Sequence, residues 1–110
     1  MSRRAINAFL VAAYLSALLN ASALVLLLIS SERFSSPQIH QTFMGSVAWF
    51  FIGVLLSGAA VVFFHFHRLL YGDQGRDDAV TTITPVSSAM SLLMLVLGIW
   101  ESIPLTRITG

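Results

Sequence analysis

The sequence predicts an all-α integral membrane protein that crosses the bilayer as three transmembrane helices, on the evidence of its composition and hydropathy pattern. Hydrophobic residues make up 56% of the 110 residues and charged residues only 10%, whereas soluble domains average about 45–50% apolar and about 25% charged residues. A soluble chain of this size has too much surface for its volume to bury that much apolar material. Lipid removes this difficulty because it solvates the outer faces of the helices.

Three stretches are long and apolar enough to cross about 30 Å of hydrocarbon, which takes about 20 residues. They cover about residues 5–30, 44–67 and 79–100. We expect helices rather than strands, since a helix satisfies its own backbone hydrogen bonds in lipid. The third stretch opens with polar residues, and Pro85 either marks its true start or kinks it. The whole chain, residues 1–110, is predicted to form one membrane domain.

The segments between the spans are predicted loops. Residues 31–43 contain Pro37 and several small polar residues, which favours a break in the helical structure. In the second loop, Asp77 and Asp78 suit the N-terminal turn of the third helix, where the helix dipole favours negative charge. Glu101 directly follows the third span and is expected to be a solvated carboxylate at the helix end.

The distribution of arginines predicts the orientation of the spans, because positive charges near span ends favour the cytoplasmic side. Four arginines would share the side of the N-terminus and two the opposite side. We therefore expect a cytoplasmic N-terminus and a C-terminus on the outer or periplasmic side, in a multi-pass protein of the bacterial inner (cytoplasmic) membrane. The first group is Arg3, Arg4, Arg68 and Arg76, and the second is Arg33 and Arg107.

Small residues mark the faces through which helices pack in lipid, because they let two backbones approach closely. The predicted helix-packing residues are Ala12, Ser16 and Asn20 in the first span, Gly53 and Ser57 in the second, and Ser87 and Ser91 in the third. These faces either hold the three helices to one another or dock another subunit. Asn20 lies near the middle of its span, where an unpaired amide is costly. We expect it to hydrogen-bond a neighbouring helix through Ser57 or Ser91.

Residues that carry chemistry are scarce. No acidic or basic side chain lies in the apolar centre of any span, which argues against a proton relay or an ion-coupled carrier. No catalytic or metal-ligand motif appears, and the absence of cysteine removes thiolate metal sites. The basic residues form no cluster that would bind nucleic acid. We expect no enzymatic activity of its own, no metal site and no nucleic-acid partner, although the chain could be a non-catalytic subunit of an enzyme complex.

A group at the end of the second span is the candidate cofactor site: His65, His67, Arg68 and Tyr71. One imidazole could ligate haem iron or donate to a quinone carbonyl, with Arg68 near a propionate or quinone oxygen. His65 and His67 point about 200° apart on a helix, so they cannot ligate the same metal. A second haem ligand would have to come from a partner subunit. The alternatives are an interfacial anchor among lipid headgroups and a pH-responsive contact.

Two families share features with the chain. Its size and three-helix count resemble the membrane anchors of succinate dehydrogenase, but the His-rich span and Ser/Arg quinone site of that family have no counterpart here. The stretches FFHFHRLLYG and PVSSAMSLLMLVLGIW resemble the last helices of antiporter-like subunits of complex I and related hydrogenases. The charged residues of that family lie on helices that this chain lacks. Neither resemblance therefore transfers a site.

Three functional hypotheses follow from the sequence. The first is a small accessory subunit of a larger membrane complex, whose partners are lipids and other membrane protein subunits. The second is a haem- or quinone-binding anchor subunit of a respiratory or photosynthetic electron-transfer complex. The third is a self-oligomerising pore of the holin type. Scarce membrane charge and abundant small residues favour the first.

Overall fold

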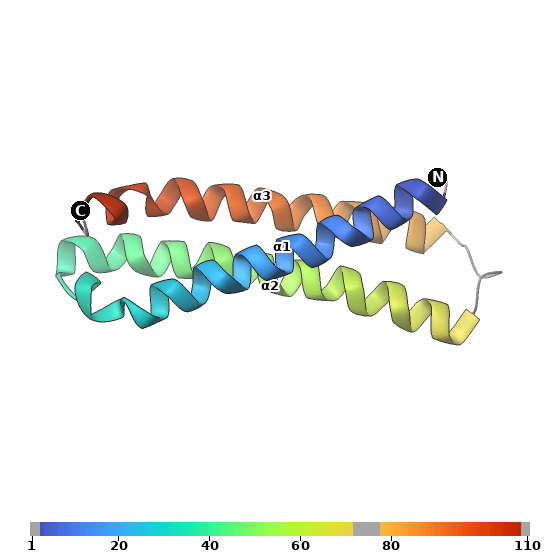
Figure 1. Cartoon of the computed structure of the whole chain (residues 1–110), viewed down its shortest axis with the longest axis horizontal. Helices are drawn as coiled ribbons and strands as arrows, with labels where there is room; N and C mark the ends of the chain where they lie inside the picture. The colour runs from blue at the N-terminus through green and yellow to red at the C-terminus, as the bar shows by residue number, and fades with distance from the viewer. Residues whose placement is uncertain (1–2, 72–77, 109–110) are drawn as a thin grey trace.

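The computed structural model describes residues 3–71 and 78–108, and this part of the chain is helical apart from two short connections. Its elements are α1 (Arg3–Ile29), the 3-10 helix η1 (Ser31–Phe34), α2 (Pro37–Tyr71) and α3 (Asp78–Ile108). The three long helices lie side by side along the molecule (Figure 1), which measures 54 × 20 × 17 Å. Each contains a segment long and apolar enough to cross a membrane. The predicted all-α fold with three such helices is confirmed.

α2 begins earlier than the sequence predicted. Its first residue is Pro37, and the carbonyl of Ser36 accepts hydrogen bonds from the amides of Ile39 (3.0 Å) and His40 (2.8 Å). Proline suits the first position of a helix, because the amide it lacks would have no intrahelical partner there. The prediction that residues 31–43 break the helix was therefore wrong from Pro37 onward. α2 has 35 residues and is about 52 Å long at 1.5 Å per residue.

α3 is longer at its C-terminal end than the predicted third span. Pro85 and Pro104 both lie inside this helix, so Pro85 does not mark its start. The helix runs past Trp100 to Ile108, and Glu101 therefore lies within it. The prediction of a solvated carboxylate at the helix end was wrong for Glu101, which is half-buried against Gly45 of α2. Arg76, predicted to lie on the side of the N-terminus, and Asp77, predicted for the first turn of the third helix, are outside the described residues.

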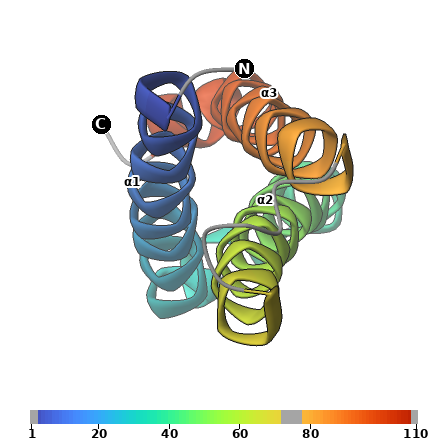
Figure 2. The same ribbon diagram turned by 90° about the vertical axis from the view of Figure 1, so that its right-hand side faces the viewer.

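Viewed along the long axis, the three helices surround a common interior (Figure 2). The fully buried side chains of this interior are mostly small and polar, while large apolar side chains point outward. This is the inverse of a soluble bundle, and it fits a lipid environment, in which the outside must be apolar and close helix approach needs small residues. The buried polar side chains are Ser16, Asn20, Ser46, Ser57, Thr84, Ser88 and Ser91.

One end of the bundle is held by larger side chains. Phe34 of η1, Phe43 of α2 and Leu105 of α3 form a buried apolar cluster. The rings of Phe34 and Phe43 stack with centroids 5.5 Å apart. This contact fixes η1 against α2 and so determines where the residues beside Phe34 lie.

Candidate functional site

The interior of the bundle is organised around Asn20, which links α1 to both other helices. Its Nδ2 donates to the carbonyl of Ser16 (2.8 Å), to the Ser16 hydroxyl oxygen (3.0 Å) and, at 3.5 Å, to the carbonyl of Ser91 on α3. On its other side, the carboxamide lies against Gly53 of α2, where an added Cβ would overlap it. Its Oδ1 is buried and has no hydrogen-bond partner among the described residues. One side chain thus fills the space between three helices.

Two of the buried serines, Ser57 and Ser91, satisfy their hydroxyls within their own helices, whereas the buried Ser46 hydroxyl has no partner among the described residues. Ser57 Oγ donates to the carbonyls of Gly53 (2.8 Å) and Val54 (3.1 Å), and Ser91 Oγ donates to that of Ser88 (2.7 Å). Bonds of this kind, three or four residues back, leave a small side chain without an unsatisfied polar group. Ser88 is different, because its Oγ donates across helices to the carbonyl of Phe9 on α1 (2.9 Å).

We call this central group the polar seam; its residues are Ser16, Asn20, Gly53, Ser57, Ser88 and Ser91. Of the helix-packing residues named from the sequence, Ala12 and Ser87 are only half-buried and the other five lie in the seam. Asn20 reaches α3 through the Ser91 backbone, whereas Ser57 bonds to its own helix. The sequence predicted Ser87 as a packing residue, but the buried residue is its neighbour Ser88. The spacing of Thr84, Ser88 and Ser91 places them on one helix face and could have identified it.

Three glycines allow a neighbouring side chain to lie directly against a helix backbone, at three levels of the bundle. Gly53 receives the carboxamide of Asn20. A Cβ on Gly98 would lie 2.6 Å from the ring of Phe50, and one on Gly45 would lie 2.7 Å from Glu101 Oε1. Real Cβ contacts are essentially never this short, so side chains from adjacent helices fill the interior at these levels.

The candidate cofactor residues do not gather into one site. His65 is exposed, and its Nε2 lies 2.6 Å from the hydroxyl of Tyr14 on α1, a partner that the sequence did not reveal. Phe64 contacts the His65 ring edge-on, with centroids 5.4 Å apart. His67 is half-buried and packs on Phe63, with centroids 6.0 Å apart.

Arg68 and Tyr71, the other two residues of the predicted cofactor site, do not complete such a site. Arg68 is exposed. Tyr71 is the last residue of α2, and its side chain lies outside the described part of the structure. Within the described residues, no three His, Asp or Glu side chains converge as a metal ion would require.

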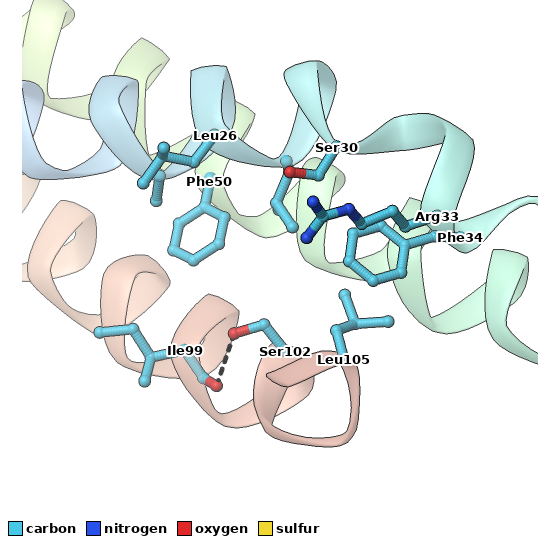
Figure 3. Close-up of a pocket in the computed structure, with 10 residues that line it drawn as sticks. Leu26, Ser30, Arg33, Phe34, Phe50, Ile99, Ser102 and Leu105 are labelled. Atoms are coloured by element: carbon cyan, nitrogen blue, oxygen red, sulfur yellow. Dashed lines mark hydrogen bonds between the residues drawn. The ribbon is translucent and has the colours of Figure 1, made fainter. Parts of the chain in front are cut away.

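A pocket of about 410 Å³ lies at the η1 end, between the last turns of α1 and those of α3. Apolar side chains form most of its wall, and the polar groups are those of Ser30, Arg33 and Ser102. Figure 3 shows the Arg33 side chain extending from η1 along the pocket toward Ser30. Sequence reasoning did not find this pocket, because residues from four elements build it. Its walls are Ala23, Leu26, Leu27, Phe34, Phe50, Ile99 and Leu105.

The chain matches no protein-family model, no curated protein sequence and no solved structure. The fold and these features define an all-helical protein with three helices long and apolar enough to cross a membrane, as in a multi-pass membrane protein.

Proposed function

We propose that this protein is a small accessory subunit of a larger membrane complex, with no catalytic activity of its own. The observation that carries the proposal is the filled interior. At Gly53, Gly98 and Gly45 a neighbouring side chain occupies the place of a Cβ. The hydroxyls of Ser57 and Ser91 bond to their own helices rather than toward an open path. The polar seam thus has the features of a packing element, and the outer surface is left for binding partners.

The outer surface offers ample area for such partners. In an 18-residue apolar segment of each candidate span, between 22% and 28% of the residues are buried inside the bundle, so most of each segment is left to face lipid or another subunit. Gly58 on α2 has no atom within 4 Å of where its Cβ would lie, and Ala59 beside it is exposed. Helices associate in lipid through close van der Waals packing, and an open glycine on an outer face allows a partner helix to approach closely.

The orientation and location belong to the same proposal. The arginine distribution favours a cytoplasmic N-terminus and a C-terminus on the outer or periplasmic side. Lipids and other membrane protein subunits would then be the partners, in the cytoplasmic membrane of a bacterium. Cysteine accessibility on the two sides of the membrane, with single cysteines placed in residues 31–36 and after Ile108, tests the orientation.

Co-purification from native membranes tests the proposed role. We expect the protein, solubilised in mild detergent, to migrate in a complex much larger than 12.0 kDa and to bring defined membrane proteins with it. Gly58→Leu fits the isolated bundle, because the position is open, and is expected to release those partners if they pack on that face. Val62→Leu, at an exposed position one turn away, is the matched control. A chain that runs alone as a monomer contradicts the proposal.

A quinone-binding anchor is the second candidate, supported by the Tyr14–His65 pair. The Tyr14 hydroxyl and the His65 imidazole lie on the outside of the bundle, beside the ring of Phe64. A quinone head group arriving from the lipid could hydrogen-bond to them there. Haem fits this geometry less well, because iron ligation through His65 Nε2 would break the bond to Tyr14. An absorption spectrum without a Soret band excludes haem. Quinone turnover unchanged in His65→Ala and His67→Ala excludes the anchor.

A self-oligomerising pore is the least favoured of the three hypotheses. Seven polar side chains of the described residues are buried within each chain, and the outer faces carry large apolar residues such as Leu18, Leu55 and Val96. A pore between chains would have to be lined by those residues. Crosslinking in membranes tests this hypothesis, since a pore requires a ladder of homo-oligomers.

A further inference from the structure

The pocket at the η1 end has the polarity of one membrane leaflet. Its inner end is apolar and is formed by Phe50 of α2 and Ile99 of α3, close to the middle of the bundle. Farther out lie the guanidinium of Arg33 and the hydroxyl of Ser30, while the hydroxyl of Ser102 lies beside the Ile99 carbonyl. The α1 wall from Ala23 to Ser30 is about 10 Å long at 1.5 Å per residue, and η1 continues it. The pocket is therefore comparable in length to half of the hydrocarbon thickness of a membrane, which is about 15 Å.

Specific contacts shape this pocket. α1 crosses the bundle obliquely, so that its last turns diverge from the last turns of α3 (Figure 1). Phe50 forms the floor between them, because Gly98 lets its ring lie against the α3 backbone. The contacts of Phe34 with Phe43 and Leu105 fix η1 across the outer end. The buried Phe34 therefore fixes the backbone beside Arg33, whose own side chain is exposed.

The charge in the pocket points to an anionic ligand. Arg33 is the one charged residue among the ten that line the pocket, and none of the ten carries a carboxylate. The nearest acid on α3, Glu101, packs against Gly45 of α2 instead. Figure 3 shows the Arg33 side chain on the inner side of η1, directed along the pocket. A planar guanidinium binds phosphate oxygens through two parallel hydrogen bonds. The Ser102 hydroxyl donates its proton to the Ile99 carbonyl at 2.9 Å, which leaves Arg33 to bind the phosphate.

We propose that this pocket binds an anionic phospholipid, with one acyl chain along the apolar wall and the phosphate on Arg33. A volume of about 410 Å³ lies in the range of about 300–1,000 Å³ that is common for small-molecule pockets. It accommodates a chain segment, while the rest of the lipid stays in the leaflet. Arg33 lies toward the end of the bundle and the apolar floor lies nearer its middle. A lipid in the leaflet has the same order, with its phosphate near water and its acyl chain toward the membrane centre. The inference is independent of the accessory-subunit proposal, because a single chain supplies every pocket residue.

Native mass spectrometry of the full chain in a mild detergent tests the proposal. The probes are phosphatidylglycerol and phosphatidylcholine with identical acyl chains. We expect one phosphatidylglycerol to bind to the wild type more tightly than phosphatidylcholine. Arg33→Gln is expected to weaken phosphatidylglycerol binding at least about tenfold, as the loss of a charge-assisted contact implies. It is expected to weaken phosphatidylcholine binding less, because the choline cation of that lipid offsets the charge of its phosphate. Arg33→Lys, which keeps the charge and loses the planar fork, is expected to fall between.

Two further variants separate the site from general charge effects. Arg4→Gln removes the same charge from an exposed position at the other end of the bundle and is expected to change neither affinity. Ala23→Phe fills the apolar wall and is expected to weaken binding of both lipids; circular dichroism verifies that the variant keeps its helices. A phosphatidylglycerol with a photoreactive acyl chain is expected to label residues 23–27 and 99–105.

Four results would overturn the proposal. The first is equal weakening by Arg33→Gln and Arg4→Gln, which would mean diffuse charge attraction. The second is equal affinity of the wild type for the two lipids. The third is displacement of phosphatidylglycerol by millimolar inorganic phosphate, which would mean a site for a free anion. The fourth is photolabelling spread evenly over the outer faces of the helices.

Discussion

The middle of the bundle and its η1 end hold the same three helices together in different ways. In the middle, the fully buried side chains are mostly small and polar, and Asn20 lies directly against the backbone at Gly53. At the η1 end, the buried side chains are Phe34, Phe43 and Leu105. Small side chains let helix axes approach, whereas large ones need distance between them. The pocket opens at this second end, where α1 and α3 diverge.

The difference is the one expected of a bundle whose middle lies in lipid and whose η1 end lies close to water. Within lipid, burying a leucine between helices gains little, because the lipid tails are equally apolar. Packing of small residues and hydrogen bonds must then hold the helices. Close to water, burial of aromatic rings again removes apolar surface from the solvent, at about 25 cal/mol per Å². The two regions should therefore respond differently to substitution, and matched pairs of variants can separate them.

Phe34→Ala is expected to have the largest effect. It removes the ring that stacks on Phe43 and contacts Leu105, and such truncations in packed cores destabilise by about 3–5 kcal/mol. SDS titration in mixed micelles, followed by circular dichroism, measures the change. Phe66→Ala, at an exposed position, is the control and should change the unfolding midpoint little. Equal effects of the two variants would show that the η1 cluster does not stabilise the fold.

The pair Gly53→Ala and Gly58→Ala tests the close approach in the middle. A methyl group at Gly53 overlaps the carboxamide of Asn20, while one at Gly58 meets open space. Overpacking of this kind costs about 1–3 kcal/mol, whereas alanine in place of a helical glycine stabilises by about 0.5–1 kcal/mol. We therefore expect shifts of opposite sign in the same SDS titration. Shifts of the same sign would contradict the placement of Asn20 against Gly53.

Composition and hydropathy predicted the three helices, because a bilayer imposes length and apolarity on any spanning segment. They did not predict the exact ends. The sequence predicts a helix break at Pro37, which instead starts α2, and a helix end at Glu101, although α3 continues to Ile108. Local patterns leave such cases open, because proline is compatible with both a loop and the first turn of a helix.

The seam and the pocket differ in how far the sequence reveals them. The spacing of small residues identified Ser16, Asn20 and Gly53 on facing sides, since that pattern repeats along each helix. It could not say which of Ser87 and Ser88 faces inward. The Tyr14–His65 contact joins residues 51 positions apart, and the pocket combines four elements. Both depend on how the helices are rotated relative to one another. Side-chain packing between helices determines this rotation, so it cannot be inferred from the sequence of one helix.

Asn20→Ala is expected to have a moderate effect on the middle of the bundle. The variant loses the bonds of Nδ2 to Ser16 and Ser91, and interhelical hydrogen bonds in membrane proteins average about 0.6 kcal/mol with a maximum of about 1.7. We expect a loss within that range, measured as above. Asn7→Ala, at an exposed position, is the matched control. A stabilising effect of Asn20→Ala would mean that the buried Oδ1 costs more than the Nδ2 bonds contribute.

The smallest effect is expected at the Tyr14–His65 pair, on the outer surface. The hydroxyl and Nε2 lie 2.6 Å apart, but both residues are exposed, so Tyr14→Phe gives up one bond that surrounding polar groups can partly replace. A double-mutant cycle with His65→Phe isolates the pairwise term, and we expect a coupling of at most about 0.6 kcal/mol. A clearly larger coupling would show that this bond, rather than the seam alone, fixes α1 to α2. The same Tyr14→Phe variant should weaken quinone binding if the pair serves as an anchor site, so a stable protein with lost quinone binding would separate function from packing at this position.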